Sequence, residues 1–403
     1  MQSNYPYLRE TNERLTTING GSLGVGDLTT DAWGVQKVSL PHSIFHGMWT
    51  FDIPQSMWFM YENDVQVYTS TNIVSSGGAA VLTADATNSS VILESRECPR
   101  YQPNRGHLFS TAVICPNKTA DAHRMWGLAL HGENEIQFQL KSDGLLYAQR
   151  TSANVLLNDE VIDTSVVPSF DVEKGNIYDI QYQWRGVGNY LFFINNCLVH
   201  ELNLLGTLTE VSLQNPALPV HFHVERGTED ASMKIGCVDI TSENGASQDQ
   251  EQYGSIYAEA VAISTDTPVV VLHQPETIGA YVNTRTLTLA RISVTCSKKG
   301  TFKVWTTRNP TNITGATYVA ATGGFVETDS PDTATGAVRA TAVTIANMDF
   351  VTAIPVEAAV TRSVDNPYRG RIEFPLVRGD YLVVTGTAAT ASADCVIEFG
   401  QQI

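Results

Sequence analysis

The stretch that decides the fold is residues 177–196, IYDIQYQWRGVGNYLFFINN. From Tyr178 to Trp184 every second residue is apolar, which is the period-two pattern of a half-buried strand. The run GVGN at 186–189 tolerates positive φ and lets the chain reverse before a second apolar run at 190–194. Two asparagines then make the next turn, and residues 197–200 continue as a third strand. The stretch predicts an antiparallel meander.

The same pattern of short apolar runs between Gly, Asn, Asp and Pro recurs on both sides, while helical periodicity is nearly missing. The fold class predicted is therefore all-β. One further hairpin, RISVTCSKKGTFKVW at 291–305, has its tip at 298–300. The other predicted strands are 79–82, 91–94, 107–113, 126–130, 136–140, 145–150, 220–224, 233–240, 256–264, 269–273, 287–296, 301–306, 338–345, 372–375, 381–386 and 395–399.

Changes in composition predict how the chain is divided. Residues 1–45 are polar, rich in Gly and Thr and without periodicity, which indicates an extended N-terminal arm that reaches a neighbouring subunit or anchors on a larger particle. A β-domain follows at 46–243. Residues 244–254 have the polar composition of a linker. Residues 255–403, with many Thr, Ala and Val, form a second, smaller β-sandwich.

The charge balance excludes several classes of protein. The 403 residues carry 25 Lys and Arg against 42 Asp and Glu, a formal net charge of -17. Nucleic acids and anionic membranes both attract basic surfaces, so neither is an expected partner. No apolar window reaches the ~18 residues of a membrane-spanning helix. The first residues, MQSNYPYLRETNERL, lack the basic and apolar regions of a secretory signal.

Cysteine is scarce and scattered, and no CxxC or Cys/His cluster with zinc-site spacing occurs. Because the chain is expected to be made in a reducing cytosol, we expect these thiols to be buried and reduced. Disulfides that form after release from the cell remain an open alternative. No cofactor is predicted. The six cysteines are Cys98, Cys115, Cys197, Cys237, Cys296 and Cys395.

Two of the histidines have a spacing that can chelate a metal. His221 and His223 lie on one face of a predicted strand, and Glu225 continues that face, so a His/His/Glu set is geometrically conceivable. Histidine is also common on solvated strand faces, and this interpretation is favoured. His42, His46 and His107 are isolated and pair with no recognisable nucleophile. No metal ligand is predicted.

Carboxylates are plentiful, and a glycosidase needs two of them across a cleft. Jelly-roll glycosidases place them on one strand face in an ExDxxE-type motif, whereas ENEIQF at 133–138 has no third acid in register, which favours a solvated strand edge. The run 158–160 lacks the alternating oxygen ligands of a calcium loop and is interpreted as a solvated turn. No catalytic residue is predicted, and we expect no enzymatic activity. The carboxylates considered are Glu94, Glu97, Glu133, Glu135, Asp159, Glu160 and Asp171.

Aromatic side chains could build a platform for sugar rings, since aromatic faces pack on apolar surfaces. Core and interface packing is the favoured alternative. Trp184 shares a strand face with Tyr182 and Ile180, which predicts a core position. The other aromatics considered are Trp49, Trp58, Tyr61 and Trp126.

The meander resembles concanavalin-like and laminin-G-like jelly rolls, in which a strand ending in Trp, a Gly-containing turn and an aromatic strand run into an Asn-rich turn. Five stretches between residues 98 and 243 also resemble a recurring domain of tailed-bacteriophage virion proteins. The resemblance implies a concanavalin-like jelly roll at 46–243 in a particle component made in the infected cell, and transfers no catalytic residues. The stretches are CPRYQPNRGHLFSTAVICPNK, LKSDGLLYAQR, FDVEKGNIYDIQYQWRGVGNYLFFIN, LLGTL and NPALPVHFHVERGTEDASMKIGCVDITSE.

Two functions then compete. The favoured one is a non-enzymatic virion structural protein on the particle exterior, a head decoration or head-fibre protein. It would be made in the host cytoplasm and would bind its own copies and the major capsid or other virion proteins, with a trimer, common among β-rich projections, as one candidate assembly. The alternative is a tail or baseplate adhesin that binds host surface glycan. A depolymerase-type enzyme is a third, weaker hypothesis. Aromatic and acidic residues clustered at one site would favour the adhesin or the enzyme. These residues are dispersed along the sequence, which favours the virion structural protein.

Overall fold

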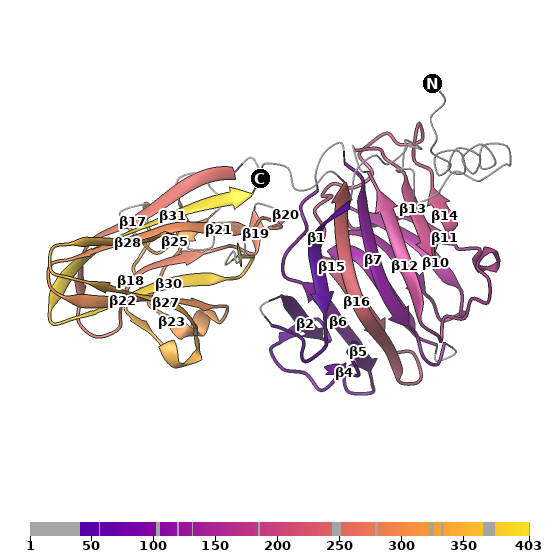
Figure 1. Cartoon of the computed structure of the whole chain (residues 1–403), viewed down its shortest axis with the longest axis horizontal. Helices are drawn as coiled ribbons and strands as arrows, with labels where there is room; N and C mark the ends of the chain where they lie inside the picture. The colour runs from indigo at the N-terminus through magenta and orange to yellow at the C-terminus, as the bar shows by residue number, and fades with distance from the viewer. Residues whose placement is uncertain are drawn as a thin grey trace, which may run out of the picture. The chain divides into compact units, whose positions relative to one another are not determined.

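The structure is a computed structural model that describes residues 41–402, apart from 56, 102–104, 119–120, 131, 184–185, 244–250, 279–280, 322–325, 332–333 and 366–374. The chain forms two compact units (Figure 1). The first contains the described residues up to Ser95 and from Pro99 to Glu243. The second contains Arg96–Cys98 and the described residues from Glu251 onward.

The first unit consists of two antiparallel sheets, here named sheet I and sheet II, of eight strands each (Figure 1). Sheet I has the order β14 (Cys197–Leu202), β13 (Tyr190–Ile194), β12 (Asn176–Tyr182), β7 (His107–Ile114), β16 (Ala231–Glu243), β5 (Ala79–Ala84) and β4 (Ile73–Ser76), with β1 (Pro41–Met48) paired to β16. Sheet II has the order β11 (Val155–Val161), β10 (Leu146–Ser152), β9 (Asn134–Leu140), β8 (His123–Leu130), β15 (Val220–Glu225), β6 (Ser90–Ser95), β2 (Trp58–Glu62) and β3 (Val65–Val67).

The predicted meander is confirmed as strands β12, β13 and β14. Tyr178 lies opposite Ile194, and Tyr182 opposite Tyr190, so the first two strands pair along their full length. The turn into β14 is made by two asparagines with φ of 50° and 64°, a conformation that Asn tolerates better than most residues.

Aromatic rings from both sheets meet in the core of the first unit. Trp126 of sheet II contacts Tyr178 of sheet I edge to face, with ring centroids 4.8 Å apart. Phe138 meets Phe192 in the same way at 5.0 Å. Rings in this arrangement gain about 1 kcal/mol beyond the burial of their area. The two packed antiparallel sheets confirm the predicted jelly-roll sandwich and the all-β class.

The second unit is also made of antiparallel sheets, with a core of aliphatic side chains around Val270, Ile292 and Phe302. Sheet III has the order β17 (Glu251–Ile263), β31 (Ala391–Gln402), β21 (Leu287–Cys296) and β28 (Thr361–Asp365), with β29 (Pro375–Leu376) paired to β21. Sheet IV has the order β24 (Val319–Ala320), β25 (Glu327–Thr328), β18 (Thr267–His273), β30 (Tyr381–Ala388), β22 (Gly300–Thr307) and β27 (Asp349–Val356).

Short elements complete the described chain. They are the strand pairs β19 (Thr277–Ile278) with β20 (Tyr281–Val282) and β23 (Ile313–Thr314) with β26 (Ala342–Val343), and the 3-10 helices η1 (Thr164–Val166), η2 (Pro310–Asn312) and η3 (Ile345–Asn347). No helix among the described residues has the length and apolarity to cross a membrane.

Several predicted boundaries differ from the structure. Residues 41–45, placed in the arm, belong to β1, which pairs with β16 from Pro41 to Met48; residues 1–40 lie outside the described residues. Strand β17 already begins at Glu251, inside the predicted linker. Of the strand predicted at 338–345, only the two residues of β26 are in a strand. A 3-10 helix begins at Ile345, and Ala340 and Val343 pack against residues of sheet IV instead of extending a strand.

None of the six cysteines, all of which the structure describes, forms a disulfide, and their burial is uneven. Four are buried, whereas Cys197 is half-buried and Cys237 exposed, so the expectation that all six are buried is wrong for these two. Both lie in strands of sheet I, close to its surface. Burial raises the pKa of the Cys115 thiol and of the Cys395 thiol to about 12.

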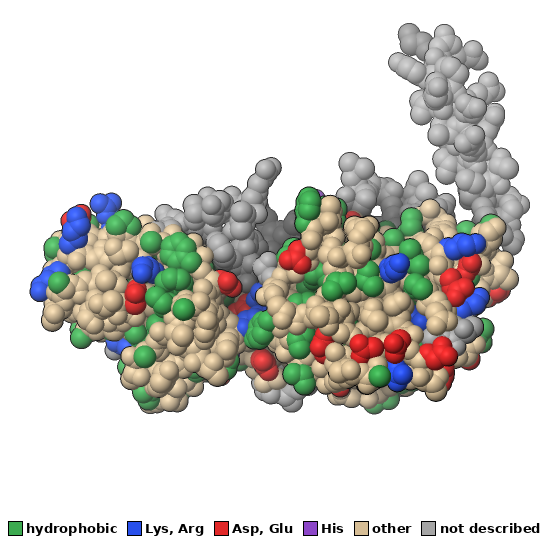
Figure 2. Space-filling view, turned by 90° about the horizontal axis from the view of Figure 1, so that it is seen from below, with side chains coloured by type: hydrophobic (Ala, Val, Ile, Leu, Met, Phe, Trp, Pro, Cys, Tyr) green, Lys and Arg blue, Asp and Glu red, His purple; other side chains and the backbone are tan. Residues whose placement is uncertain are grey.

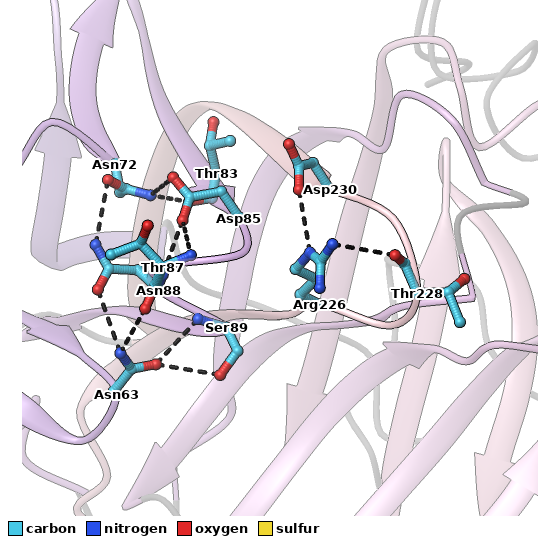
Figure 3. A network of polar contacts seen from close by, with 10 residues as sticks. All are labelled: Asn63, Asn72, Thr83, Asp85, Thr87, Asn88, Ser89, Arg226, Thr228 and Asp230. Carbon is cyan, nitrogen blue, oxygen red and sulfur yellow. Dashed lines mark hydrogen bonds and ion pairs between the residues drawn. The ribbon is translucent and has the colours of Figure 1, made fainter.

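A polar network fixes one end of the first unit, where the β5–β6 turn meets the β2–β3 turn (Figure 3). Asp85 accepts backbone N–H bonds from Thr87 and Asn88 at 2.8 Å, and these bonds lower the pKa of its carboxyl group. Asn63 accepts a bond from the backbone N–H of Ser89 at 3.0 Å. The network sets the turn geometry and with it the register of β6 in sheet II.

Candidate functional site

The two faces of sheet II differ in chemistry. Its inner face carries Phe222, Trp126 and Phe138, which pack in the core. Because successive side chains of a strand point to opposite faces, the residues between them lie on the outer face. On that face the strand register aligns one line of neighbouring residues, here named the outer row. Its members are Glu94, His221, Gly127, Gln137, Gln149 and Asp159.

The middle of the outer row is polar and buried. His221 and Gln137 have no exposed surface, and Glu94 is only 5% exposed. His221 Nδ1 lies 3.6 Å from Glu94 Oε2. Buried polar groups of this kind are costly unless they are hydrogen-bonded, so their position on an outer sheet face calls for an explanation.

Two amide oxygens on this face have no hydrogen-bond donor among the residues that the structure describes. Gln137 donates through Nε2 to Gln149 Oε1 at 3.1 Å, but its own Oε1 is buried and unpaired. Gln139, two residues further on the same face, donates to His123 Nδ1 at 3.4 Å and likewise leaves its Oε1 unpaired. Each unsatisfied acceptor costs about 1–3 kcal/mol.

Gly127 contributes no side chain to the outer row between His221 and Gln137. A Cβ at this position would lie 2.4 Å from the Ile136 carbonyl oxygen and 2.7 Å from the Cα of Gln137, closer than real contacts. Only glycine fits this close approach of two strands.

The accessible rim of the face lies at the β10–β11 end. Tyr147 and Gln149 are half-buried. The Lys141 ammonium lies 4.0 Å from the centroid of the Tyr147 ring and pairs with Asp159. Tyr147 donates its hydroxyl to Asp143 at 2.7 Å, which raises the pKa of the phenol. An aromatic face, an amide, a carboxylate and a cation thus surround the two buried acceptors.

The acids of this face do not form a close pair. Glu135 is buried and accepts bonds at 2.8 Å from the backbone N–H of Gly132 and from the Thr151 hydroxyl. It lies three strands from Glu94 in the sheet order, roughly 14 Å at the usual strand spacing. Retaining and inverting glycosidases separate their carboxylates by roughly 5 Å and 6.5–9.5 Å.

The histidines considered as metal ligands do not converge. His221 approaches Glu94, whereas His223 Nε2 lies 3.0 Å from Ser90 Oγ and 3.9 Å from Glu225 Oε1. No group of three or more His, Cys, Asp or Glu side chains with metal-binding geometry occurs in the described part of the chain. His42 and His46 lie on β1, in the other sheet.

The remaining histidine, His107, forms a three-ring cluster with Tyr101 and Tyr182 at the end of the core, with centroids 5.0 and 5.4 Å away. Its burial lowers the pKa of the imidazole to about 4.

The remaining acids lie apart from the outer row or at its end. Residues 158–160, interpreted as a solvated turn, are instead part of the edge strand β11, because the turn of this hairpin is made by Ala153 and Asn154 at positive φ. Glu133 lies in the turn before β9, and Asp171 organises the turn before β12 by accepting the Glu173 N–H at 3.1 Å. Glu97 belongs to the second unit.

Three of the five aromatic residues considered as a sugar platform lie in the core. Trp49, Trp58 and Trp126 are buried between the sheets, where Trp49 and Trp58 both contact Phe222. Tyr61 is half-buried. Trp184, expected in the core, lies outside the described residues.

The prediction from sequence missed Gln137, Gln139, Gln149 and the rim residues Lys141 and Tyr147. One signal was present: EIQFQL at 135–140 alternates polar and apolar residues, which places Glu135, Gln137 and Gln139 on one face. What no sequence pattern reveals is that this polar face is buried.

Neither a known family model nor a curated protein matches the sequence. Solved structures do match over about half of the chain. They include the endo-1,3-beta-glucanase from Streptomyces sioyaensis, with 13% identity over 51% of this chain and 97% of that chain and a TM-score of 0.37. They also include the laminarinase catalytic domain from Thermotoga petrophila, with 14% identity over 52% and 100% of the two chains and a TM-score of 0.39. The Bacillus licheniformis beta-glucanase matches at 10% identity over 49% and 98%, with a TM-score of 0.36.

At such identities the likeness concerns the jelly-roll fold alone. It nevertheless corrects one expectation. The prediction that this chain is not an enzyme is contradicted by neighbours named as endo-glucanases, and it is withdrawn. These neighbours are carbohydrate-active proteins. Membership in a virion stays a prediction.

Proposed function

We propose that the first unit binds a neutral saccharide on the outer face of sheet II. The observation that carries this proposal is the polar face on which the accessible rim residues Tyr147 and Gln149 lie next to Gln139 and Gln137, whose amide oxygens lack a donor among the described residues. Sugar hydroxyls donate to such acceptors, and the half-buried Tyr147 ring offers an apolar surface for a sugar ring. Glu94, Glu135 and Asp159 give the face acidic character, which disfavours anionic sugars.

Calorimetric titration of the full-length protein tests the proposal. The probes are a β-1,3-linked and a β-1,4-linked glucohexaose, with a polyuronate hexamer as the charged comparison. We expect binding of a neutral probe in the micromolar to millimolar range, and weaker or no binding of the uronate.

Two substitutions test whether the outer face of sheet II is the binding face. Gln137→Leu removes one acceptor and should abolish binding, whereas Gln183→Leu changes a buried amide that directly follows β12 in the other sheet and should leave binding unchanged. The proposal fails if no neutral probe binds at about 10 mM, or if both variants bind like the wild type.

We propose further that the chain is a component of a tailed-bacteriophage particle, on its exterior, in contact with its own copies and with other virion proteins. The support is the resemblance of residues 98–243 to a recurring virion domain, together with the acidic surface, on which red side chains gather along one margin of the first unit (Figure 2). Saccharide binding would make it an adhesin for host glycan.

Deletion of residues 1–40 tests this second proposal. The cut leaves β1 intact, so the sandwich keeps its pairing with β16. The shortened protein should fold but no longer join particles when supplied to infected cells, as measured by quantitative mass spectrometry of purified particles. Normal occupancy by the shortened protein would show that the arm is not the anchor, and absence of the full chain from particles would overturn the virion proposal.

A further inference from the structure

The outer face of sheet IV, in the second unit, is covered only in part. Phe302 and Val304 of β22 point into the aliphatic core. Because side chains alternate along a strand, Lys303 and Trp305 lie on the outer face. Trp305 is half-buried and borders the part of this face on which three residues of the segment between β22 and β27 pack. These three residues are Ile313, Ala340 and Met348.

Trp305 and Phe350 form an aromatic pair at this border. They lie opposite each other on β22 and β27, with ring centroids 5.3 Å apart and an angle of 68° between the ring planes. Phe350 is 57% exposed. Trp305 Nε1 donates to the hydroxyl of the buried Thr385 at 3.0 Å, which satisfies the only polar atom of the indole side chain. The ring surface that remains accessible is therefore apolar.

Polar side chains lie beside the aromatic pair. Lys303 Nζ is 5.8 Å from the centroid of the Trp305 ring and 3.0 Å from Asp266 Oδ1. The same carboxylate oxygen accepts a hydrogen bond from the Thr387 hydroxyl at 3.1 Å. The side chains of Lys303 and Asp266 are 33% and 27% exposed, so solvent and ligands reach both. Because the two charges compensate each other, the site favours a neutral ligand.

The accessible apolar surface is too small for a protein partner. The exposed large hydrophobic residues that the structure describes in the second unit are Tyr257, Val338, Phe350 and Val360, and of these only Phe350 belongs to the aromatic pair. A stable protein interface buries about 800 Å² on each partner, whereas one aromatic side chain provides about 150–250 Å². Two rings with a polar margin match a ligand of one or two sugar rings.

We propose that Trp305 and Phe350, together with Lys303 and Asp266, bind one or two rings of a neutral saccharide. The C–H face of a pyranose packs on aromatic rings, and its hydroxyl groups donate to the Asp266 carboxylate and accept from the Lys303 ammonium. All residues of this site belong to the second unit. The site therefore stands independently of saccharide binding on the outer face of sheet II.

Fluorine NMR of the full-length protein labelled with 5-fluorotryptophan tests the proposal, because Trp305 is the only tryptophan after residue 244. Trp305→Phe identifies its resonance. The probes are β-1,3-linked glucobiose, β-1,4-linked glucobiose and β-1,4-linked galactobiose, with glucuronate as the charged comparison. At least one neutral probe should shift the Trp305 resonance in a saturable way, with a Kd of about 1 mM, and glucuronate should bind more weakly.

Three substitutions locate the site. Phe350→Ala removes one of the two rings and Lys303→Met removes the ammonium donor, and each should raise the Kd by about tenfold. Tyr257→Ala is the matched control, because it truncates an exposed aromatic residue of sheet III, and it should bind like the wild type. Because Phe350 is more than half exposed, circular dichroism should show an intact fold in Phe350→Ala.

Three outcomes would each overturn the proposal. The first is a Trp305 resonance that no neutral probe shifts at about 50 mM. The second is wild-type binding by both Phe350→Ala and Lys303→Met. The third is a set of shifts confined to the earlier tryptophans, which would support saccharide binding by the first unit and not by the second.

Discussion

Phe138 and Gln137 are neighbours in β9, and both are fully buried, yet they lie in opposite environments. Phe138 faces inward and meets three aromatic rings. Gln137 faces outward, into a row of polar side chains with an unpaired oxygen. The comparison shows that burial alone does not reveal what a residue does. The inner face of sheet II holds the sandwich together, whereas the outer face holds polar groups at a cost to stability that a ligand can repay.

The largest effect is expected on the inner face. Phe138→Ala should lower the free energy of unfolding of the first unit by about 3–5 kcal/mol, because it removes ring contacts and leaves a cavity. Urea unfolding followed by tryptophan fluorescence measures this, since five of the six tryptophans precede residue 244. Phe302→Ala, in the core of the second unit, is the control and should leave the tryptophan transition of the first unit unchanged. If both variants lowered the free energy of unfolding measured by tryptophan fluorescence by the same amount, the two units would unfold together.

A polar group of sheet I, at the end of the same core, should make the stability of the first unit depend on pH. Burial lowers the pKa of His107 to about 4, below the value of ~6.5 in an unfolded chain. The unfolded state therefore binds the proton more readily, so His107 contributes stability above pH 6.5 that is lost as the pH falls toward 4. The loss amounts to about 3 kcal/mol.

Urea unfolding at a series of pH values checks this, with His107→Gln as the comparison. The variant should lose less stability between pH 7 and pH 4 than the wild type. Parallel pH profiles of the two proteins would show that carboxylates alone cause the acid instability.

Gly127 tests whether the close approach of β8 and β9 on the outer face is obligatory. Gly127→Ala should destabilise the first unit by about 1–3 kcal/mol, because its Cβ meets the backbone of Gln137. Thermal unfolding by calorimetry measures the effect. Gly175→Ala is the control, since a Cβ there has its nearest contact at 3.8 Å, an ordinary van der Waals distance. If both substitutions have the same effect, the close approach of the two strands does not require glycine at position 127.

The inner face could be predicted from sequence and the outer face could not, for a physical reason. Alternation along Tyr178, Ile180 and Tyr182 marks apolar residues that must be buried, so it indicates the strand, its core face and the sandwich. The same alternation places the polar residues Gln137 and Gln139 on the opposite strand face from Phe138. A polar strand face is usually inferred to be exposed to solvent. Their burial depends on neighbours from β8, β10 and β15, which are up to ~90 residues away in the chain and are brought together only by the register of sheet II.

The edge strand β11 was missed for a related reason. Its sequence, VLLNDEV, has three apolar residues in a row and then three polar ones, so it shows no alternation. Its strand conformation comes from pairing with β10, with a register shift between Arg150 and Thr151. Local patterns predict strands that have one buried face, and β11 has none.

The smallest effect on stability is expected for Gln137→Leu, which compares the outer face with the inner face at neighbouring residues. Gln137→Leu replaces the buried amide by an apolar side chain of similar volume and removes the unpaired oxygen. The Gln149 oxygen loses its donor, but it belongs to a half-buried residue that water can reach. The free energy of unfolding should therefore change by less than about 1 kcal/mol, against about 3–5 kcal/mol for Phe138→Ala one residue away. Urea unfolding of both variants measures the difference. If Gln137→Leu cost as much as Phe138→Ala, the outer row would be structural, and its buried polar groups would need no ligand to explain them.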